Sequence, residues 1–362
     1  MAVDRRLERQ AALRTAIEGE GLDALLVSHV PNIRYLTGFS GSAALLVVRR
    51  DATILITDFR YAAQAPAEAG ASASVEVDQK SVWERLAKVL AAVPPAALGI
   101  EGQALSVRDA QRVSELTRAR VVTTGDLVEH LRAVKSPEEV AAIRAAATLA
   151  QDGLAETLPG VRVGQTEREI AAALESALRR RGSEWHPFPT IVASGPRSAL
   201  PHARTSAREV AAGEWLLLDF GAEVDGYCAD LTRTVIVGAR ANDKQRAVYE
   251  LVRSAQRRAV TGIRAGMTGR EADALARDVI AARGFGESFG HSLGHGLGLE
   301  VHEAPRLAPT AETLLPAGAV VTVEPGVYLP GWGGVRLEDD VHLSAAGPVR
   351  LSDGMTELVE LV

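Results

Sequence analysis

The second half of the chain repeats itself in register. The segment VRVGQTERE (161–169) returns as IRAGMTGRE (263–271), 102 residues later. Each copy leads into a helix pattern that ends in Arg-Gly. The segment AGEWLLLDFG (212–221) then returns as AGAVVTVEPG (317–326), 105 residues later. Three matches in the same order indicate that this half folds as two related copies of one unit.

The repeat places a carboxylate at the same point of each copy. Asp219 in LLLDFG corresponds to Glu324 in VTVEPG, and both follow apolar, strand-like runs. Asp230 and Glu338 follow on the next strand of each copy. Isolated buried carboxylates are costly, so such groups are normally paired, protonated or bound to a metal.

The first pair of strands has a defined geometry. Asp225 and Gly226 form a favoured two-residue hairpin turn between WLLLDF and YCADLTRTVIV. This turn pairs Asp219 with Thr232. Because side chains alternate between the faces of a strand, Asp219 and Asp230 become diagonal neighbours on one face.

A second hairpin, turning through residues 330–334, is expected to present Glu324 and Glu338 in the same manner. Two such hairpins brought together place four carboxylates around one space. That space would carry about −4 without cations, which predicts bound metal or strongly raised pKa values.

One histidine completes a metal-ligand set. Oxygen-rich ligation with one imidazole favours Mn, Co, Fe or Zn. Four carboxylates suffice to bridge two ions about 3.5–4 Å apart, the spacing of two-metal hydrolases. No GxSxG motif is present, and the single cysteine, Cys228, has no evident catalytic partner. The candidate ligands are Asp219, Asp230, His295, Glu324 and Glu338.

Three histidines lie in HSLGHGLGLEVH: His291, His295 and His302. Four glycines between positions 290 and 298 argue against a helix there and favour an extended segment that lines a pocket. His202 follows the helix of the first copy as His302 follows that of the second. Neighbouring carboxylates that could replace a ligand are Glu303, Asp339 and Asp340.

The first half has a different pattern. Strand-like segments at 22–28, 42–48 and 52–57 alternate with helix-like segments, which predicts an α/β domain with a mixed sheet. Ser136-Pro137-Glu138-Glu139 is a strong helix start. We therefore predict an N-terminal α/β domain over 1–130 and a catalytic domain over 131–362.

Composition excludes some functions. The net charge of −6 argues against nucleic acid as a main partner. The charged first residues, MAVDRRLERQAALR, predict an amphipathic helix rather than a signal peptide, and no apolar run predicts a membrane span. A lone cysteine fits a reducing cytoplasm.

These motifs resemble the Xaa-Pro peptidases, the family of prolidase and aminopeptidase P. The likeness includes NIRYLTGFSGS (32–42), ILITDFRY (54–61) and the five-ligand pattern with GHGLGLEVHE. It implies an α/β fold with a creatinase/prolidase-type N-terminal domain and a pseudo-twofold pita-bread catalytic domain.

The resemblance also implies residue roles. Asp219 would chelate one ion, His295 and Glu324 would help to hold the other, and Asp230 and Glu338 would bridge them. Glu324 also matches a proposed general base. His202 and His302 match histidines that contact substrate carbonyls and stabilise the tetrahedral intermediate, and His291 matches a pocket histidine. Tyr328 and Arg336 match groups behind the ligands that are linked to proton movement.

By the same resemblance we expect two divalent ions, Mn²⁺ first, a homodimer, and short Xaa-Pro peptides as substrates. A dipeptidase is favoured over aminopeptidase P, and a non-catalytic pita-bread peptide-binding protein is the remote alternative. A dipeptidase must close the space beyond proline. By position alone, the candidate arginines for this are Arg34, Arg49, Arg50 and Arg60.

Overall fold

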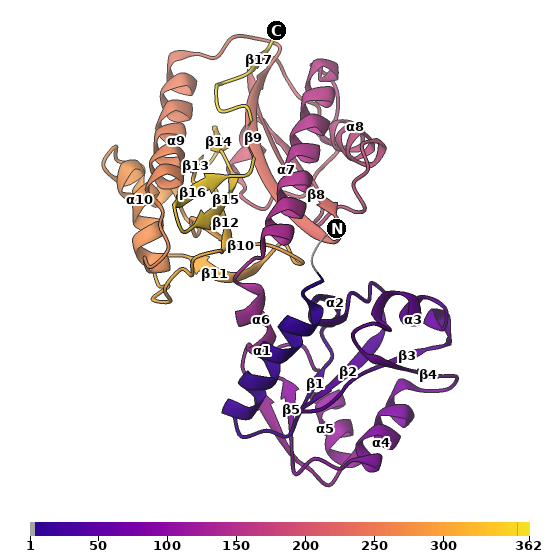
Figure 1. Cartoon of the computed structure of the whole chain (residues 1–362). Helices are drawn as coiled ribbons and strands as arrows, with labels where there is room; N and C mark the ends of the chain where they lie inside the picture. Colours follow the sequence, from indigo (N-terminus) through magenta and orange to yellow (C-terminus); the bar gives the residue numbers. More distant parts are fainter. Residues whose placement is uncertain (1–3, 353) are drawn as a thin grey trace. The chain divides into compact units, whose positions relative to one another are not determined.

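The computed structural model describes residues 4–352 and 354–362 and divides into two compact units (Figure 1). The first unit ends at Arg132 and the second begins at Ala133. The first predicted helix begins, within the described residues, at Arg6; residues 1–3 of that prediction lie outside them. Among the described residues, no helix combines the length and the apolar run that a membrane span requires.

The first unit contains a mixed six-stranded sheet in the order β4-β3-β2-β1-β5-β6. Strands β1–β2 and β2–β3 are antiparallel and the other neighbours are parallel, so the predicted mixed sheet is confirmed. The strands are β1 (Ala24–Val27), β2 (Ala44–Arg49), β3 (Thr53–Asp58), β4 (Ser74–Asp78), β5 (Ala97–Glu101) and β6 (Arg120–Thr124).

Helices surround this sheet, and every residue of the central strand β1 is buried, as is typical of a sheet covered on both faces. The helices are α1 (Arg6–Gly19), α2 (Val30–Thr37), α3 (Gln64–Ala69), α4 (Val82–Ala92), α5 (Val107–Leu116) and α6 (Leu127–Arg132). The Arg49 guanidinium is buried and donates to the Val93 carbonyl (3.2 Å), so it serves the packing of this unit. Arg60 is more than half exposed and pairs with Asp58 (2.7 Å).

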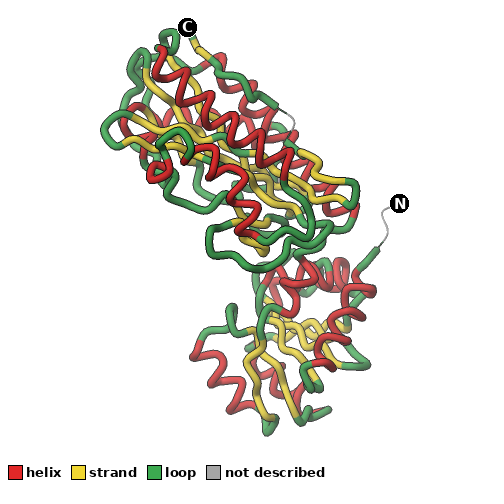
Figure 2. The backbone as a smooth tube through the Cα atoms, turned by 90° about the vertical axis from the view of Figure 1, so that its left-hand side faces the viewer, coloured by secondary structure: helices red, strands yellow, loops and turns green. Residues whose placement is uncertain are grey.

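The second unit places helices on two sides of its strands (Figures 1 and 2). Helices α7 and α8 lie on one side and α9 and α10 on the other, and α7 packs on β8 and β9. The helices are α7 (Pro137–Thr157), α8 (Glu167–Arg180), α9 (Asp243–Gly262) and α10 (Gly269–Ala281). The predicted start of α7 is confirmed, with Ser136 and Glu139 forming a capping box.

The strands of this unit form three groups. One sheet contains β7 (Ile191–Ser194), β8 (Glu214–Val224), β9 (Tyr227–Val237) and β17 (Glu360–Leu361). A second contains β10 (Gly294–Gly296), β11 (Glu303–Leu307), β12 (Val320–Val323), β15 (Asp339–Ser344) and β16 (Gly347–Arg350). The ribbon of β13 (Gly326–Leu329) and β14 (Gly333–Arg336) completes them.

The internal repeat is visible in the two helices α8 and α10. Thr166 and Glu169 form a capping box at the start of α8, and Thr268 and Glu271 form the same box on α10. In both boxes the threonine N–H donates to the glutamate at 2.7 Å. The sequence repeat is therefore a repeat of local structure.

The first hairpin has the predicted register. Asp225 and Gly226 have φ values of 52° and 76°, as a two-residue turn of this kind requires. Asp219 lies opposite Thr232, and Asp230 lies two pairs further along the ladder, on the same face. The diagonal arrangement of the two aspartates is confirmed.

The second hairpin differs from the first. Its two ladders share one register, since Val323 pairs with Asp339 and Gly326 with Arg336. Glu324 and Glu338 therefore lie directly opposite each other, not diagonally, at a break between the ladders. Pro325 has no N–H and cannot donate to a ladder, which accounts for a break at this point. The prediction that both hairpins present their carboxylates identically was wrong.

Candidate metal centre

Three of the predicted ligands form a compact group. Asp230, His295 and Glu338 each offer a ligand atom, and these atoms all lie within 4.8 Å of one another. Asp230 comes from β9 and His295 from β10, while Glu338 lies between β14 and β15. The fold thus brings residues from separate copies of the repeat into one place.

Glu324 lies at the edge of this group. Its Oε1 is 3.5 Å from Nε2 of His295, and the same nitrogen is 3.7 Å from Oδ2 of Asp230. The Thr322 hydroxyl donates to Glu324 (3.2 Å) and accepts from the His295 N–H (3.0 Å). Thr322 therefore fixes two predicted ligands to the end of one strand.

Asp219 has a different immediate partner. It forms a buried ion pair with Arg336. Burial raises the pKa of Asp219, and the charges of Arg336, His202 and His302 oppose this rise. The His302 ring also lies near His295, with ring centroids 4.3 Å apart. His302, one of the predicted substrate histidines, therefore lies beside the predicted ligand His295.

The carboxylates strongly perturb one another. Burial, and then the charge of Glu338, raises the pKa of Asp230 well above its ordinary value. Burial raises the pKa of Glu324 to about 8 and that of Glu338 well above its usual range. Burial lowers the pKa of His295 to about 4, so its imidazole is neutral and can bind a metal.

The site also contains an acceptor without a donor. Oδ1 of Asp230 is buried and has no hydrogen-bond partner among the described residues, and the same holds for Oδ1 of Asp340. Oδ2 of Asp340 accepts from the Asp230 N–H at 3.2 Å. A divalent cation would satisfy such an oxygen and neutralise the crowded carboxylates. The donor set therefore fits metal ions.

Two neighbouring carboxylates are engaged elsewhere. Glu303 forms a buried ion pair with Lys135 (3.1 Å). Asp339 pairs with the buried Arg233 (2.8 Å). These contacts compensate their charges, so neither substitutes for a ligand in this arrangement.

A chain of hydrogen bonds leads from a pocket histidine to Asp219. Nε2 of His291 lies 2.9 Å from the Tyr328 hydroxyl, which accepts from Arg336 at 2.9 Å. Arg336 in turn contacts Asp219. Burial lowers the pKa of His291 to about 4 and raises that of Tyr328 to about 12, so both groups are neutral near pH 7. The predicted pocket groups His291, Tyr328 and Arg336 thus form one connected unit.

Sequence reasoning missed the two threonines that support the ligands. The Thr232 hydroxyl donates to Glu338 (2.5 Å) and accepts from Nε of Arg336 (2.9 Å). Thr322 contacts Glu324 as described above. A signal existed for both, since Thr232 is opposite Asp219 and Thr322 precedes Glu324 by two positions, on the same strand face.

His202 is exposed on the loop that follows the short helix η3 (Gly195–Ala199). It lines an open hollow of about 700 Å³ together with three arginines. Those arginines are Arg168, Arg197 and Arg204. The His202 side chain is therefore accessible from solvent.

Both parts of the chain are similar to known protein families. Residues 141–345, more than half of the chain, match metallopeptidase family M24. The chain belongs to this family. Residues 9–134 of the M24 protein match the creatinase/prolidase N-terminal domain. The predicted family and two-domain fold class are confirmed.

Relatives of this M24 metallopeptidase match it almost end to end. An Xaa-Pro dipeptidase from Pyrococcus horikoshii is 35% identical over 322 residues, which cover 88% of this chain and 89% of the relative. The structure of an Xaa-Pro dipeptidase from Bacillus anthracis has a TM-score of 0.95 and 40% identity, covering 98% of this chain and 100% of that one. An X-Pro aminopeptidase from Thermotoga maritima has a TM-score of 0.88 and 38% identity, covering 94% and 98%.

Proposed function

We propose that this M24 metallopeptidase hydrolyses the Xaa-Pro bond of short peptides and acts mainly as a dipeptidase. One observation carries the proposal: Asp230, His295 and Glu338 converge within 4.8 Å, bordered by the buried Asp219 and the partly buried Glu324. The similarity to an Xaa-Pro dipeptidase with a TM-score of 0.95 supports the substrate class.

The five predicted ligands would hold two divalent ions. Carboxylates and one imidazole suit Mn²⁺ first, with Co²⁺, Zn²⁺ or Fe²⁺ as alternatives. When bound, such ions polarise a carbonyl and lower the pKa of water. The ligands are Asp219, Asp230, His295, Glu324 and Glu338.

Glu324 is the residue best suited to hold and move a proton. Burial raises its pKa to about 8 in the metal-free site, so this environment allows the carboxyl to take up a proton. The leaving nitrogen of proline must gain a proton as the bond breaks. We assign this transfer to the Glu324 carboxylate, which would take a proton from the attacking water and pass it to the proline nitrogen.

The imidazoles of His202 and His302 would bind the substrate. Imidazole N–H groups can donate to carbonyl oxygens and stabilise the negative charge that develops during attack. The unit of His291, Tyr328 and Arg336 would orient Asp219 through the contacts described above.

The chemistry suits proline. An Xaa-Pro bond has no amide N–H and a fixed φ, which defeats sites that recognise the amide proton. A site built from carboxylates and histidines needs only the carbonyl oxygen, the free amine and the leaving nitrogen. The absence of the amide proton therefore carries no penalty here.

The deciding experiment compares Ala-Pro with Ala-Pro-Ala in the presence of Mn²⁺. A dipeptidase cleaves Ala-Pro with the higher kcat/KM, and clearly faster cleavage of the tripeptide would assign aminopeptidase P instead. Binding of both peptides without cleavage of either, after loading with Mn²⁺ or Co²⁺, would support the non-catalytic alternative.

We further propose that the protein acts in the cytoplasm as a homodimer, with neither a nucleic acid nor a membrane as a partner. Light scattering during size-exclusion chromatography tests the dimer. A mass of one chain, 38.3 kDa, would contradict it.

A further inference from the structure

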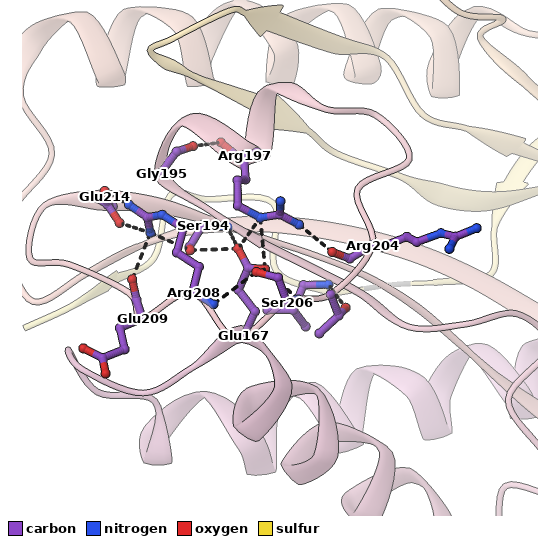
Figure 3. A network of polar contacts seen from close by, with 12 residues as sticks. Glu167, Ser194, Gly195, Arg197, Arg204, Ser206, Arg208, Glu209 and Glu214 are labelled. Atoms are coloured by element: carbon purple, nitrogen blue, oxygen red, sulfur yellow. Dashed lines mark hydrogen bonds and ion pairs between the residues drawn. The ribbon is translucent and has the colours of Figure 1, made fainter.

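A fully buried carboxylate fastens both ends of the loop that carries His202. Glu167 is the first residue of α8, and its side chain has no exposed surface. Ser194 and Ser206, which bracket His202 in the chain, both donate to this carboxylate (Figure 3). One side chain thus spans the base of the loop.

The contacts are numerous. Oε1 of Glu167 accepts from the N–H (2.8 Å) and the hydroxyl (2.9 Å) of Ser194. Oε2 accepts from the N–H (2.9 Å) and the hydroxyl (2.6 Å) of Ser206. Nε of Arg197 adds an ion pair at 3.1 Å, and its other end donates to the carbonyl of Arg204. Each carboxylate oxygen therefore holds one end of the loop.

These bonds keep Glu167 charged. Burial raises the pKa of Glu167, but the hydrogen bonds from Ser206 and Ser194 outweigh burial and leave the pKa below its ordinary value. An anion in this position accepts from two backbone N–H groups that would otherwise be buried without partners. Neither a neutral amide nor an apolar side chain could do this at both ends.

The far side of the same loop meets the metal centre. The carbonyl of Pro201, the residue before His202, accepts from Arg336 at 3.1 Å. Arg336 is the residue that contacts Asp219. The loop that carries His202 is therefore fixed at its base by Glu167 and, next to His202, by Arg336.

The second copy of the repeat has a comparable anchor. Asp273 on α10 is buried, accepts from the Leu293 N–H (3.0 Å) and pairs with Arg277 (2.6 Å). Arg277 donates to the carbonyls of Phe289 and His291, both at 2.7 Å. In each copy, a carboxylate on the repeat helix thus fixes the backbone around a histidine of the site.

The two anchors occupy different helix positions. By the offset of 102 residues, Glu167 corresponds to Gly269 and Asp273 corresponds to Ala171, one helical turn later. The repeat alone therefore does not account for both carboxylates. What the two carboxylates share is that each binds the backbone of a segment that carries a histidine of the site.

We propose that Glu167 is a positioning residue that sets the His202 imidazole for substrate binding through the loop from Ser194 to Ser206. The inference rests on the proposed function of His202, which it deepens. The hydrogen bonds and the ion pair of Glu167 go to this loop, and the loop also reaches Arg336 through the Pro201 carbonyl. We assign the effect of Glu167 on catalysis to His202 rather than to Arg336.

The test replaces Glu167 by Gln, with Glu169→Gln as the matched control. Glu169 is two residues away on the same helix, and its carboxylate accepts from the N–H and the hydroxyl of Thr166 at the exposed helix start. Glu167→Gln replaces one carboxylate oxygen by an NH₂ group, which donates hydrogen bonds. This group would face the N–H and the hydroxyl of one serine, which also donate. A displacement of about 1 Å can cost about 100-fold in rate. We expect kcat/KM on Ala-Pro to fall roughly 10–100-fold, with the control unchanged.

A double-mutant cycle shows whether the effect passes through His202. In a His202→Ala background, Glu167→Gln should cause little further loss of kcat/KM. If the fold-loss in kcat/KM of the double variant equals the product of the two single losses, the proposal is overturned, because Glu167 would then act by another route. Ser206→Ala removes the hydroxyl that donates to Glu167 and accepts from the Arg208 N–H, but keeps the backbone bond to Glu167, and it serves if Glu167→Gln does not fold. It should lower kcat/KM in the same direction, again only when His202 is present.

A second readout does not depend on activity. The His202 ring signals, in ¹H–¹⁵N spectra of histidine-labelled protein, should shift or broaden in Glu167→Gln and stay in place in Glu169→Gln. Unchanged ring signals with a lower Tm would mean a purely structural role. If the wild-type protein cleaves no Xaa-Pro peptide, the proposed function fails, yet these spectra still decide whether Glu167 positions His202.

Discussion

Arg336 and Asp219 form a buried ion pair at the edge of the carboxylate group. The same guanidinium donates to Tyr328, Thr232 and the carbonyl of Pro201. It is thus a fixed positive charge in a site crowded with carboxylates. Part of the charge compensation that metal ions would supply is therefore built into the protein.

Replacing Arg336 by Met should destabilise the metal-free protein more than the metal-loaded protein. Removing one partner of a buried pair leaves an uncompensated charge and typically costs about 3–5 kcal/mol. Bound cations would compensate Asp219 and reduce that cost. Urea unfolding with EDTA and with Mn²⁺ measures both values.

A matched control is Arg246→Met, which removes an ion pair with Glu360 (2.6 Å) whose arginine is half exposed. Exposed pairs contribute about 0–1 kcal/mol, and this loss should not depend on metal. An equal loss for Arg336→Met in both conditions would contradict a link between Arg336 and metal-site charge.

Asp230→Asn should lower metal content and abolish peptide cleavage. The change removes a charge at the centre of the compact group while keeping the side-chain volume. Metal analysis after desalting, together with the rate on Ala-Pro, measures the two effects. Asp243→Asn, at the start of α9 and away from the compact group, is the control. Near-normal turnover of Asp230→Asn would refute its assignment as a ligand.

Thr232→Val should weaken metal binding and stability together. The change keeps the volume but removes the hydroxyl that donates to Glu338 and accepts from Arg336. A buried polar group left without its partner costs about 1–3 kcal/mol. Calorimetric titration with Mn²⁺ and urea unfolding measure the losses.

Thr57→Val is the control for Thr232→Val. Its buried hydroxyl donates to the Ala43 carbonyl (2.7 Å) within the first unit. We expect a loss of stability of about 1 kcal/mol and unchanged Mn²⁺ affinity. If both variants bind Mn²⁺ like the wild type, Thr232 does not support the ligand set.

Local rules predicted some features well. The register that places Asp219 opposite Thr232 followed from one dipeptide, because a two-residue turn fixes all the pairs behind it. The second hairpin failed under the same reasoning because its turn is longer than two residues. That turn sets a register in which Glu324 and Glu338 lie directly opposite each other.

Other features depend on contacts between distant segments. Glu167 meets Ser194 and Ser206 across 27 and 39 residues, respectively. Nothing in the helix pattern of EREIAAALESALRR distinguishes this carboxylate from its exposed neighbour Glu169. The pairing of Arg336 with Asp219 likewise spans 117 residues and requires the two copies to be folded together.

The metal-free protein should lose stability as the pH rises from about 6.5 to 8, above the ordinary pKa of the buried histidines. Burial raises the folded-state pKa of Glu324 from 4.5 to about 8, and those of Asp219, Asp230 and Glu338 are also raised. The folded state therefore holds protons that the unfolded state releases in this range. The contribution of these carboxylates to stability is highest below the unfolded pKa values and falls as the pH passes through the folded ones.

Metal should reverse this trend, because ions bind the deprotonated carboxylates. Thermal unfolding with EDTA and with Mn²⁺ tests the sign: the gain in Tm from Mn²⁺ should be larger at about pH 8 than at about pH 6.5. Glu324→Gln cannot titrate, so it should flatten the fall in the metal-free Tm, whereas Glu169→Gln should not. A metal-free Tm that rises steadily over this range would show that these carboxylates are not buried together without a cation.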